Sequence, residues 1–265
     1  MKINPFVILA ATYHPRGEMT RLERILPQLR AAYAEMIVVV PPHTPPDVVE
    51  CLREWFGAGL VVSQDWAHGR HLALAHALDF AGEFVHYADM DRLIRWVETR
   101  PEEWARAIAE IPRHECLIFG RTEAAWETHP RALRDTERVT SHVFSAILGQ
   151  ELDLSAGSKG FSRAAAEWIV RNSRPERALG KDSEWVILAH RGGFRVSQML
   201  VDGLDWEIPD RHQDRAADGD RVARVREEYD ANVESWRMRV GVAREIAEAG
   251  VEALKRDLPV RSEAR

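Results

Sequence analysis

Residues 83–91 read Glu-Phe-Val-His-Tyr-Ala-Asp-Met-Asp, and the interpretation of the whole chain starts from this stretch. Its first part, Glu83 to Ala88, is short and mostly apolar, which predicts a buried strand. The strand runs directly into Asp89 and Asp91. Two carboxylates two positions apart, on the loop after a strand, can both reach one hard divalent cation. The same pattern also occurs by chance at solvated loop ends, so its place in the fold decides between the two readings.

Apolar runs on both sides of this stretch alternate with segments of helical spacing. Strands are predicted over residues 6–10, 36–40, 60–62 and 116–119, and helices over 20–33, 45–56 and 69–80 and from Pro101 onward. This alternation predicts a mostly parallel sheet with helices on both faces. Ligands of such sheets bind beyond the carboxyl ends of the strands, which is where Asp89 and Asp91 are expected.

The second half of the chain predicts further helices and a charged C-terminal part. Helices are predicted over residues 131–149, 163–172 and 180–190, a loop over 153–162 and a strand over 194–201. Beyond Leu204 charged residues become denser, and apolar residues at spacings of three or four from Val225 to Leu254 predict an amphipathic helix. We therefore expect one α/β domain over residues 1–204 and a helical extension over 205–265 that packs on it.

Composition and charge exclude several classes of protein. The chain has 265 residues and a formal net charge of −6, which argues against a dedicated nucleic-acid binder. No window approaches the roughly 20 apolar residues of a membrane span, and the N-terminal apolar run is too short for a signal peptide. The two cysteines, Cys51 and Cys116, form no disulfide framework, so a reducing cytoplasm is the expected compartment.

With Asp89 and Asp91 at the end of its predicted fourth strand, the chain resembles nucleotide-sugar glycosyltransferases of GT-A fold, especially family 2-like members. The resemblance covers roughly residues 5–202 through the order of motifs. It implies a Rossmann-like, mostly parallel sheet and a Mg²⁺- or Mn²⁺-dependent transfer of a hexose from a UDP- or GDP-sugar to a hydroxyl acceptor. Asp91 would be the main metal ligand, and Asp89 would reach the metal or the ribose.

The resemblance also assigns residues to the donor. Gly69 and Arg70 match the start of the family's helix before the Asp-X-Asp strand, where a helix N-terminus and a cation bind an anion, so Arg70 would contact the diphosphate. An exposed surface arginine is the alternative reading. Thr12 and Tyr13 follow the first strand, where the family recognises the base, and Tyr13 would stack on it. The family's acidic residue after the second strand is replaced here by Pro-Pro-His, which leaves the identity of the base open.

Three more residues are implied for the acceptor side and the metal. Gly157 lies in a small-residue loop that would allow close approach to a sugar. Asp182 sits where the family carries the carboxylate that takes the acceptor proton, although a helix cap at Asp182 or Ser183 explains the same residues. His212 follows the last predicted strand and would be a third metal ligand, the alternative being an exposed loop histidine.

Two other functions remain open at this stage. Sugar-phosphate nucleotidyltransferases share the fold, but they carry a glycine-rich loop with Arg and Lys after the first strand, whereas residues 10–17 have one glycine and Arg16 only. A non-catalytic domain that binds a sugar nucleotide is the second alternative. A homodimer is also compatible with the sequence, and the acceptor is not specified.

Overall fold

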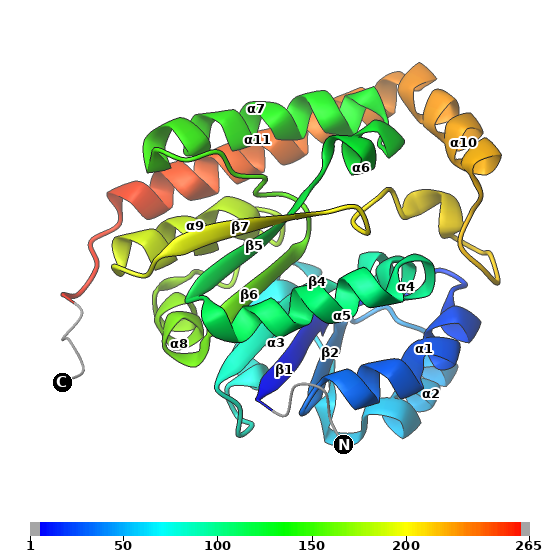
Figure 1. The fold of residues 1–265 in the computed structure, drawn as a ribbon, viewed down its shortest axis with the longest axis horizontal. Helices are drawn as coiled ribbons and strands as arrows, with labels where there is room; N and C mark the ends of the chain where they lie inside the picture. Colours follow the sequence, from blue (N-terminus) through cyan, green and yellow to red (C-terminus); the bar gives the residue numbers. More distant parts are fainter. Residues whose placement is uncertain (1–5, 261–265) are drawn as a thin grey trace.

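A seven-stranded sheet forms the centre of the computed structural model, which describes residues 6–260 (Figure 1). The strands are β1 (Val7–Thr12), β2 (Met36–Val40), β3 (Leu60–Val62), β4 (Phe84–Asp89), β5 (Cys116–Arg121), β6 (Ser158–Ser162) and β7 (Val196–Val201). Their order is β3-β2-β1-β4-β6-β5-β7, and every neighbouring pair is parallel except those made by β6. The predicted fold class, a mostly parallel sheet flanked by helices, is confirmed.

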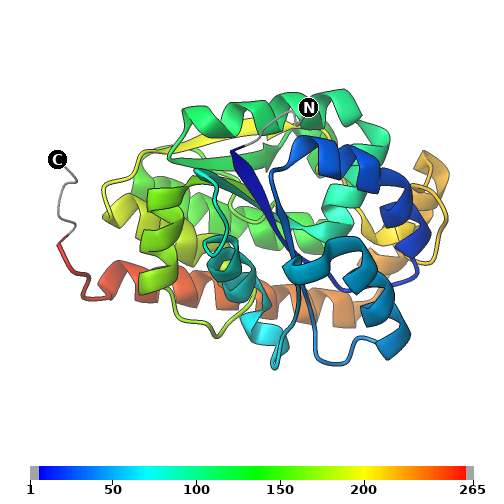
Figure 2. The same cartoon turned by 90° about the horizontal axis from the view of Figure 1, so that it is seen from below.

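Helices cover both faces of this sheet. They are α1 (Met19–Ala32), α2 (Pro46–Phe56), α3 (Gly69–Ala77), α4 (Met90–Thr99), α5 (Pro101–Glu110), α6 (Glu123–Thr128), α7 (Arg131–Leu148), α8 (Arg163–Asn172), α9 (Lys181–Arg191), α10 (Gly219–Ala231) and α11 (Val233–Lys255). Side chains alternate along β1, so Val7 and Leu9 pack with α1, α2, α4 and α5, and Ile8 packs with α3, α8 and α9. Figure 2 shows α4 and α5 on one side of the sheet and α3 and α8 on the other.

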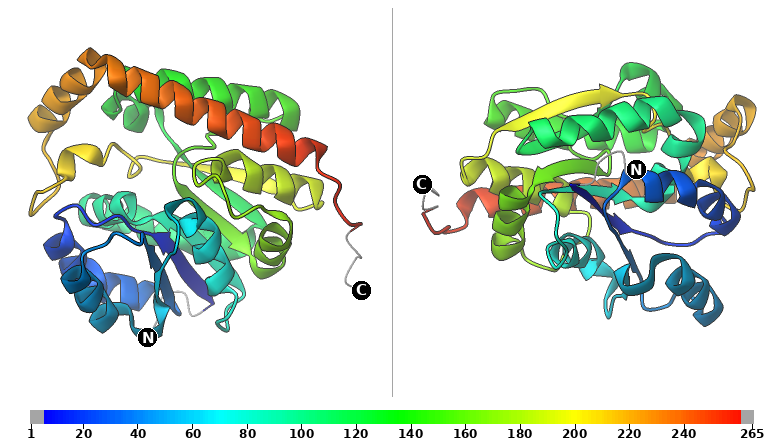
Figure 3. Two further views of the ribbon diagram at one scale, coloured as in Figure 1. Left: turned by 180° about the vertical axis from the view of Figure 1, so that it is seen from behind. Right: turned by 60° about the horizontal axis from the view of Figure 1, so that its bottom comes forward.

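The C-terminal part forms two helices where the sequence predicts one continuous amphipathic helix. Asn232 separates them, because its side chain accepts a hydrogen bond from the backbone N–H of Glu234 and caps α11. α11 packs against α7 and α9, and it runs alongside α7 in Figures 1 and 3. Within residues 6–260 no helix is long and apolar enough to cross a membrane.

Strand β6 is the main departure from the predicted elements. The sequence predicts a loop over 153–162, but Ser158–Ser162 forms an antiparallel strand in the middle of the sheet, between β4 and β5. Its side chains are mostly polar, and Lys159 is nevertheless buried, because its Nζ donates to the carbonyl of Leu154 and to Asp182. The carboxylate that pairs with Lys159 comes from the start of α9, so the local pattern carries no strand signal.

The Asp-X-Asp stretch also differs from its expected placement on a loop. Asp89 is the last residue of β4, and Asp91 lies in the first turn of α4, which follows without an intervening loop. β4 pairs in parallel with β1, and Asp89 lies opposite Thr12 in this register. The carboxyl ends of β1 and β4 therefore bring both aspartates to one edge of the sheet.

Candidate functional site

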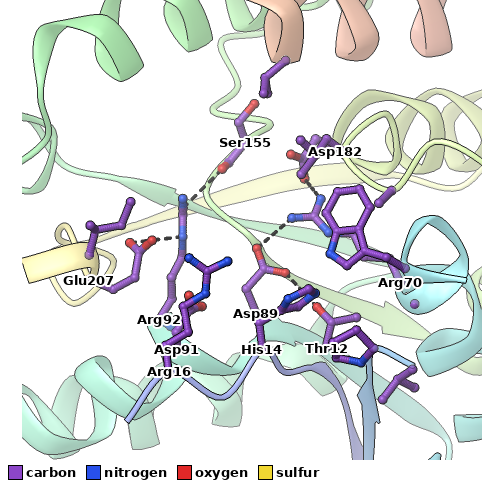
Figure 4. Close-up of a pocket in the computed structure, with 18 of the residues that line it drawn as sticks. Thr12, His14, Arg16, Arg70, Asp89, Asp91, Arg92, Ser155, Asp182 and Glu207 are labelled. Atoms are coloured by element: carbon purple, nitrogen blue, oxygen red, sulfur yellow. Dashed lines mark hydrogen bonds and ion pairs between the residues drawn. The ribbon is translucent and has the colours of Figure 1, made fainter. Parts of the chain in front are cut away.

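A cavity of about 240 Å³ opens beyond the carboxyl ends of β1 and β4. Five residues selected from the sequence line it: Thr12, Arg70, Asp89, Asp91 and Asp182. They come from β1, from the N-terminal turn of α3, from the β4–α4 junction and from the start of α9, and Figure 4 shows them around one space. This is the position at which open α/β sheets bind ligands.

Asp89 is held by three donors. Its Oδ1 accepts from the hydroxyl of Tyr87 at 2.6 Å and from Thr12 Oγ1 at 3.2 Å. Its Oδ2 accepts from the guanidinium of Arg70 at 2.7 Å. The side chain is therefore fixed in orientation at the floor of the cavity.

Arg70 bridges two carboxylates and is not an exposed surface arginine. Besides Asp89, its guanidinium donates to Asp182 Oδ1 at 2.9 Å, and the side chain is buried. Burial by itself lowers the pKa of Arg70, but Asp182 and Asp89 outweigh it and hold the pKa well above its usual value. The residue thus stays charged and joins the β4 end to the α9 start.

Asp182 has no capping role in the structure. The N-cap of α9 is Gly180, no side chain caps this helix, and the hydroxyl of Ser183 donates to backbone carbonyls. Asp182 Oδ1 accepts instead from Arg70 and from Lys159 Nζ, at 3.1 Å. Burial would raise the pKa of Asp182, but Arg70 and Lys159 bring it below the usual value. A carboxylate in this setting keeps its negative charge and is a weak proton acceptor.

Asp91 and Glu207 bring two further carboxyl groups to the cavity. Asp91 accepts a hydrogen bond from the backbone N–H of Arg92 at 3.0 Å. Burial, followed by the nearby charges of Glu207 and Asp89, raises the pKa of Asp91 to about 7. Glu207, which no sequence motif indicates as a site residue, lies between β7 and α10 and lines the same cavity. Glu207 stands among other acidic residues after the last strand, and nothing local distinguishes it from Asp205 or Asp210.

Gly157 supports the position of Asp89 from the opposite side. Its carbonyl accepts from the backbone N–H of Asp89 at 2.9 Å, and its φ of +72° favours glycine. A Cβ atom on Gly157 would lie 2.5 Å from Asp89 Oδ2 and 3.2 Å from the Cδ of Arg92. The sequence predicts that Gly157 allows the backbone to approach a sugar, whereas in the structure the group that lies against Gly157 is the side chain of Asp89.

Tyr13 and His212 do not line the cavity. Tyr13 is 1% exposed, belongs to the core cluster under α1 and donates its hydroxyl to Met19 Sδ, so it has no free ring face for stacking. His212 is exposed and lies outside the cavity, while its neighbour Arg211 lines it. The backbone N–H of His212 donates to the carbonyl of Arg16, which ties the two loops together.

The aromatic side chains that do reach the cavity are His14 and Trp66. Their ring centroids lie 5.9 Å apart in an edge-on arrangement, and Trp66 is 42% exposed. Burial and the nearby Arg16 lower the pKa of His14 to about 4, so this imidazole is neutral at pH 7. Successive side chains of an extended segment point in opposite directions, which explains why Thr12 and His14 face the cavity when Tyr13 does not.

A metal at this site would take some of its ligands from the protein and the others from a bound molecule and water. Among residues 6–260 no group of three or more His, Cys, Asp or Glu side chains is arranged to hold a metal ion. Mg²⁺ is commonly bound by one or two carboxylates together with substrate phosphates and water, and needs no complete protein cage. Asp91 fits this mode because its carboxylate lines the cavity and its one described hydrogen bond is to a backbone N–H.

Comparisons with known proteins inform the fold. No protein-family model and no curated protein sequence matches the chain. A solved structure of a mycobacterial protein is similar at 15% identity, with a TM-score of 0.52, over 89% of this chain and 74% of that one.

Two solved enzyme structures match less well. One is glucosyl-3-phosphoglycerate synthase from Mycobacterium tuberculosis with Mn²⁺ and UDP-glucose, at 15% identity, covering 89% of this chain and 79% of that one, with a TM-score of 0.46. The other is a mannosyltransferase from Pyrobaculum calidifontis with GDP-mannose and Mn²⁺, at 14% identity, covering 95% and 74%, with a TM-score of 0.37. The sheet order and the likeness to the mycobacterial protein show that the chain has the mostly parallel α/β fold that its sequence predicts.

Proposed function

We propose that this protein is a metal-dependent glycosyltransferase that moves a hexose from a nucleoside-diphosphate sugar to a hydroxyl acceptor. The observation that carries the proposal is the cluster of Asp89, Asp91 and Arg70 at the carboxyl end of β4, inside one cavity. Acidic side chains for a cation and a buried arginine meet there at the edge of the sheet where such folds bind nucleotides. This agrees with the order of motifs in the sequence.

The nucleotide lies at the end of the cavity formed by β1, β2 and the start of α3. His14 and Trp66 offer ring faces and edges to a base, and neither ring is needed to fill the core. Arg16 and Arg211 line the same cavity, and no described carboxylate pairs with either guanidinium. These two cations suit a diphosphate, whereas Arg70 is already occupied by Asp89 and Asp182.

In this proposal Asp91 would be the main ligand of the metal, and Asp89 would reach the metal or the ribose of the donor. A bound Mg²⁺ or Mn²⁺ neutralises the negative charge that develops on the leaving nucleoside diphosphate. Arg70 keeps Asp89 oriented, and Asp182 keeps Arg70 in place through its second ion pair. Asp182 is thereby a positioning residue. Its Oδ1 accepts from both Arg70 and Lys159, and its lowered pKa makes it a weak acceptor for the proton of a substrate hydroxyl.

Nucleotide binding tests this proposal before any acceptor is known. Thermal unfolding is measured with UDP, GDP, UDP-glucose and GDP-mannose, each with and without Mn²⁺. At a ligand concentration of about 100 times Kd the expected stabilisation is about 2.7 kcal/mol. Asp91→Asn should remove the Mn²⁺-dependent part of the shift.

Asp214→Asn makes the same chemical change at an exposed position outside the cavity and should leave the shift intact. The proposal is refuted if none of the nucleotides changes the melting temperature in either metal condition.

A further inference from the structure

Two buried polar atoms lack a hydrogen-bond partner on the side of the cavity away from His14 and Trp66. They are Ser155 Oγ and Glu207 Oε2, in side chains that are 4% and 7% exposed. A buried polar atom without a partner is costly, and natural proteins satisfy most such atoms. Both residues line the cavity, so a molecule bound there can supply the missing partners.

Arg92 holds these two residues close together. Its Nη1 donates to the backbone carbonyl of Ser155 at 3.3 Å, and its Nε lies 3.5 Å from Glu207 Oε2. Figure 4 shows Ser155 and Glu207 on either side of this guanidinium. Ser155 comes from the loop before β6 and Glu207 from the segment after β7, so the fold brings together two groups 52 positions apart in the chain (207 minus 155).

The two arginines near Ser155 and Glu207 already lie against carboxylates. Arg92 faces Glu207, and Arg239 of α11 lies 3.5 Å from Glu137, a carboxylate that also accepts from Arg121. Arg92 and Arg239 therefore each have a carboxylate partner. A phosphate or carboxylate here would have to compete with Glu207 and Glu137 for them, whereas a hydroxyl would add no charge.

We propose that Ser155 and Glu207 form the acceptor subsite and that the acceptor is a neutral polyhydroxyl compound, such as a carbohydrate. One acceptor hydroxyl donates to Glu207 Oε2, and a neighbouring hydroxyl accepts from Ser155 Oγ. A compound with several hydroxyls offers both a donor for Glu207 and an acceptor for Ser155, whereas an ionised phosphate or carboxylate group can only accept. The subsite rests on the proposed function, which supplies a donor at the other end of the cavity.

Acceptor binding is measured by saturation-transfer NMR on the whole protein, alone and with UDP and Mn²⁺. The probes are methyl α-D-glucopyranoside, methyl α-D-mannopyranoside, sucrose and, as the anionic comparison, 3-phosphoglycerate. We expect at least one neutral probe to bind more tightly than 3-phosphoglycerate. Glu207→Gln and Ser155→Ala should each weaken that binding about tenfold, since the first replaces a charged acceptor by a neutral amide and the second removes one hydrogen bond.

Two controls separate this role from a structural one. Glu228→Gln makes the same change at an exposed position of α10 and should leave binding unchanged. Ser155→Ala should not lower the melting temperature, because it removes a hydroxyl that has no hydrogen-bond partner among the described residues. The UDP titration of Ser155→Ala should match that of the wild type, because this variant leaves the charges around Asp91 unchanged, and it distinguishes failure of the subsite from failure of the proposed donor site.

The proposal is overturned if 3-phosphoglycerate binds more tightly than every neutral probe, or if no neutral probe binds. Unchanged binding of the neutral probe in both variants would overturn it as well.

Discussion

Substituting Gly157 by alanine tests whether the backbone beside Asp89 sets the geometry of the site. The new Cβ would lie 2.5 Å from Asp89 Oδ2, the oxygen that accepts from Arg70. The carboxylate must therefore move, and this ion pair must lengthen or break. No charged group is removed by the substitution, so its effect reports on position alone.

The magnitude has two parts. Alanine at a φ of +72° costs about 1–2 kcal/mol in backbone strain. Disturbing the hydrogen bond between two charged groups adds about 1.5–3 kcal/mol. A displacement of about 1 Å near reacting groups can lower a rate about 100-fold, so activity should fall much more than stability alone explains.

Gly149 provides the matched control. Its φ is +70°, and a Cβ there meets nothing within 4 Å. Gly149→Ala should therefore have the same backbone strain as Gly157→Ala, without a contact like that with Asp89. Urea unfolding gives the stability of both variants, and calorimetry gives their affinity for UDP with Mn²⁺. Equal losses of stability and equal affinities in Gly157→Ala and Gly149→Ala would show that contact with Asp89 does not matter.

Three further predictions follow from the charges and their partners. Burial lowers the pKa of His86 from 6.5 to about 3, so between these two pH values His86 is protonated in the unfolded chain and neutral in the folded one. Stability should then fall as pH drops below about 6.5, by about 1.4 kcal/mol per pH unit, and urea unfolding of His86→Gln should show a slope shallower by that amount; an unchanged slope would contradict the assignment. Arg70→Gln leaves two carboxylates without their shared cation and should cost about 3–5 kcal/mol in urea unfolding, whereas Arg224→Gln on the exposed side of α10 should cost less than about 0.5 kcal/mol; equal costs would mean that the buried pairs do not hold the site together. Mn²⁺ alone should bind weakly, because the described residues offer no complete cage, and UDP should tighten its binding at least tenfold in calorimetric titrations; tight binding of the metal alone would point to a different ligand set.

Much of the fold follows from local signals in the sequence. Met36–Val40 and Leu60–Val62 are short apolar runs bounded by proline or glycine, and both are strands with the predicted limits. Pro46–Phe56 and Arg163–Asn172 are helices over the predicted residues. Strand β6 lacks such a signal, because the charge of the buried Lys159 is paired with Asp182 at the start of α9, which the local sequence does not show.

Some residues of the candidate site are likewise indicated by the sequence, and others are brought to the cavity only by the fold. The residue types and their place after a buried strand indicate Asp89 and Asp91, whereas Arg70 follows from the resemblance to the glycosyltransferase family. The ion pair between Arg70 and Asp182 joins residues 112 positions apart, and no local pattern indicates it. Glu207 and Trp66 reach the cavity through the paths of two loops, which spacing along the chain does not reveal.

The most direct test of the central claim is the release of nucleoside diphosphate from UDP-glucose or GDP-mannose by the purified protein with Mn²⁺. We predict release that depends on the metal, rises when a neutral carbohydrate acceptor is added and falls at least 100-fold in Asp91→Asn, with Asp214→Asn unchanged. Release at the same rate in Asp91→Asn and wild-type protein, or no release from either donor in the presence of metal and acceptor, would contradict the account.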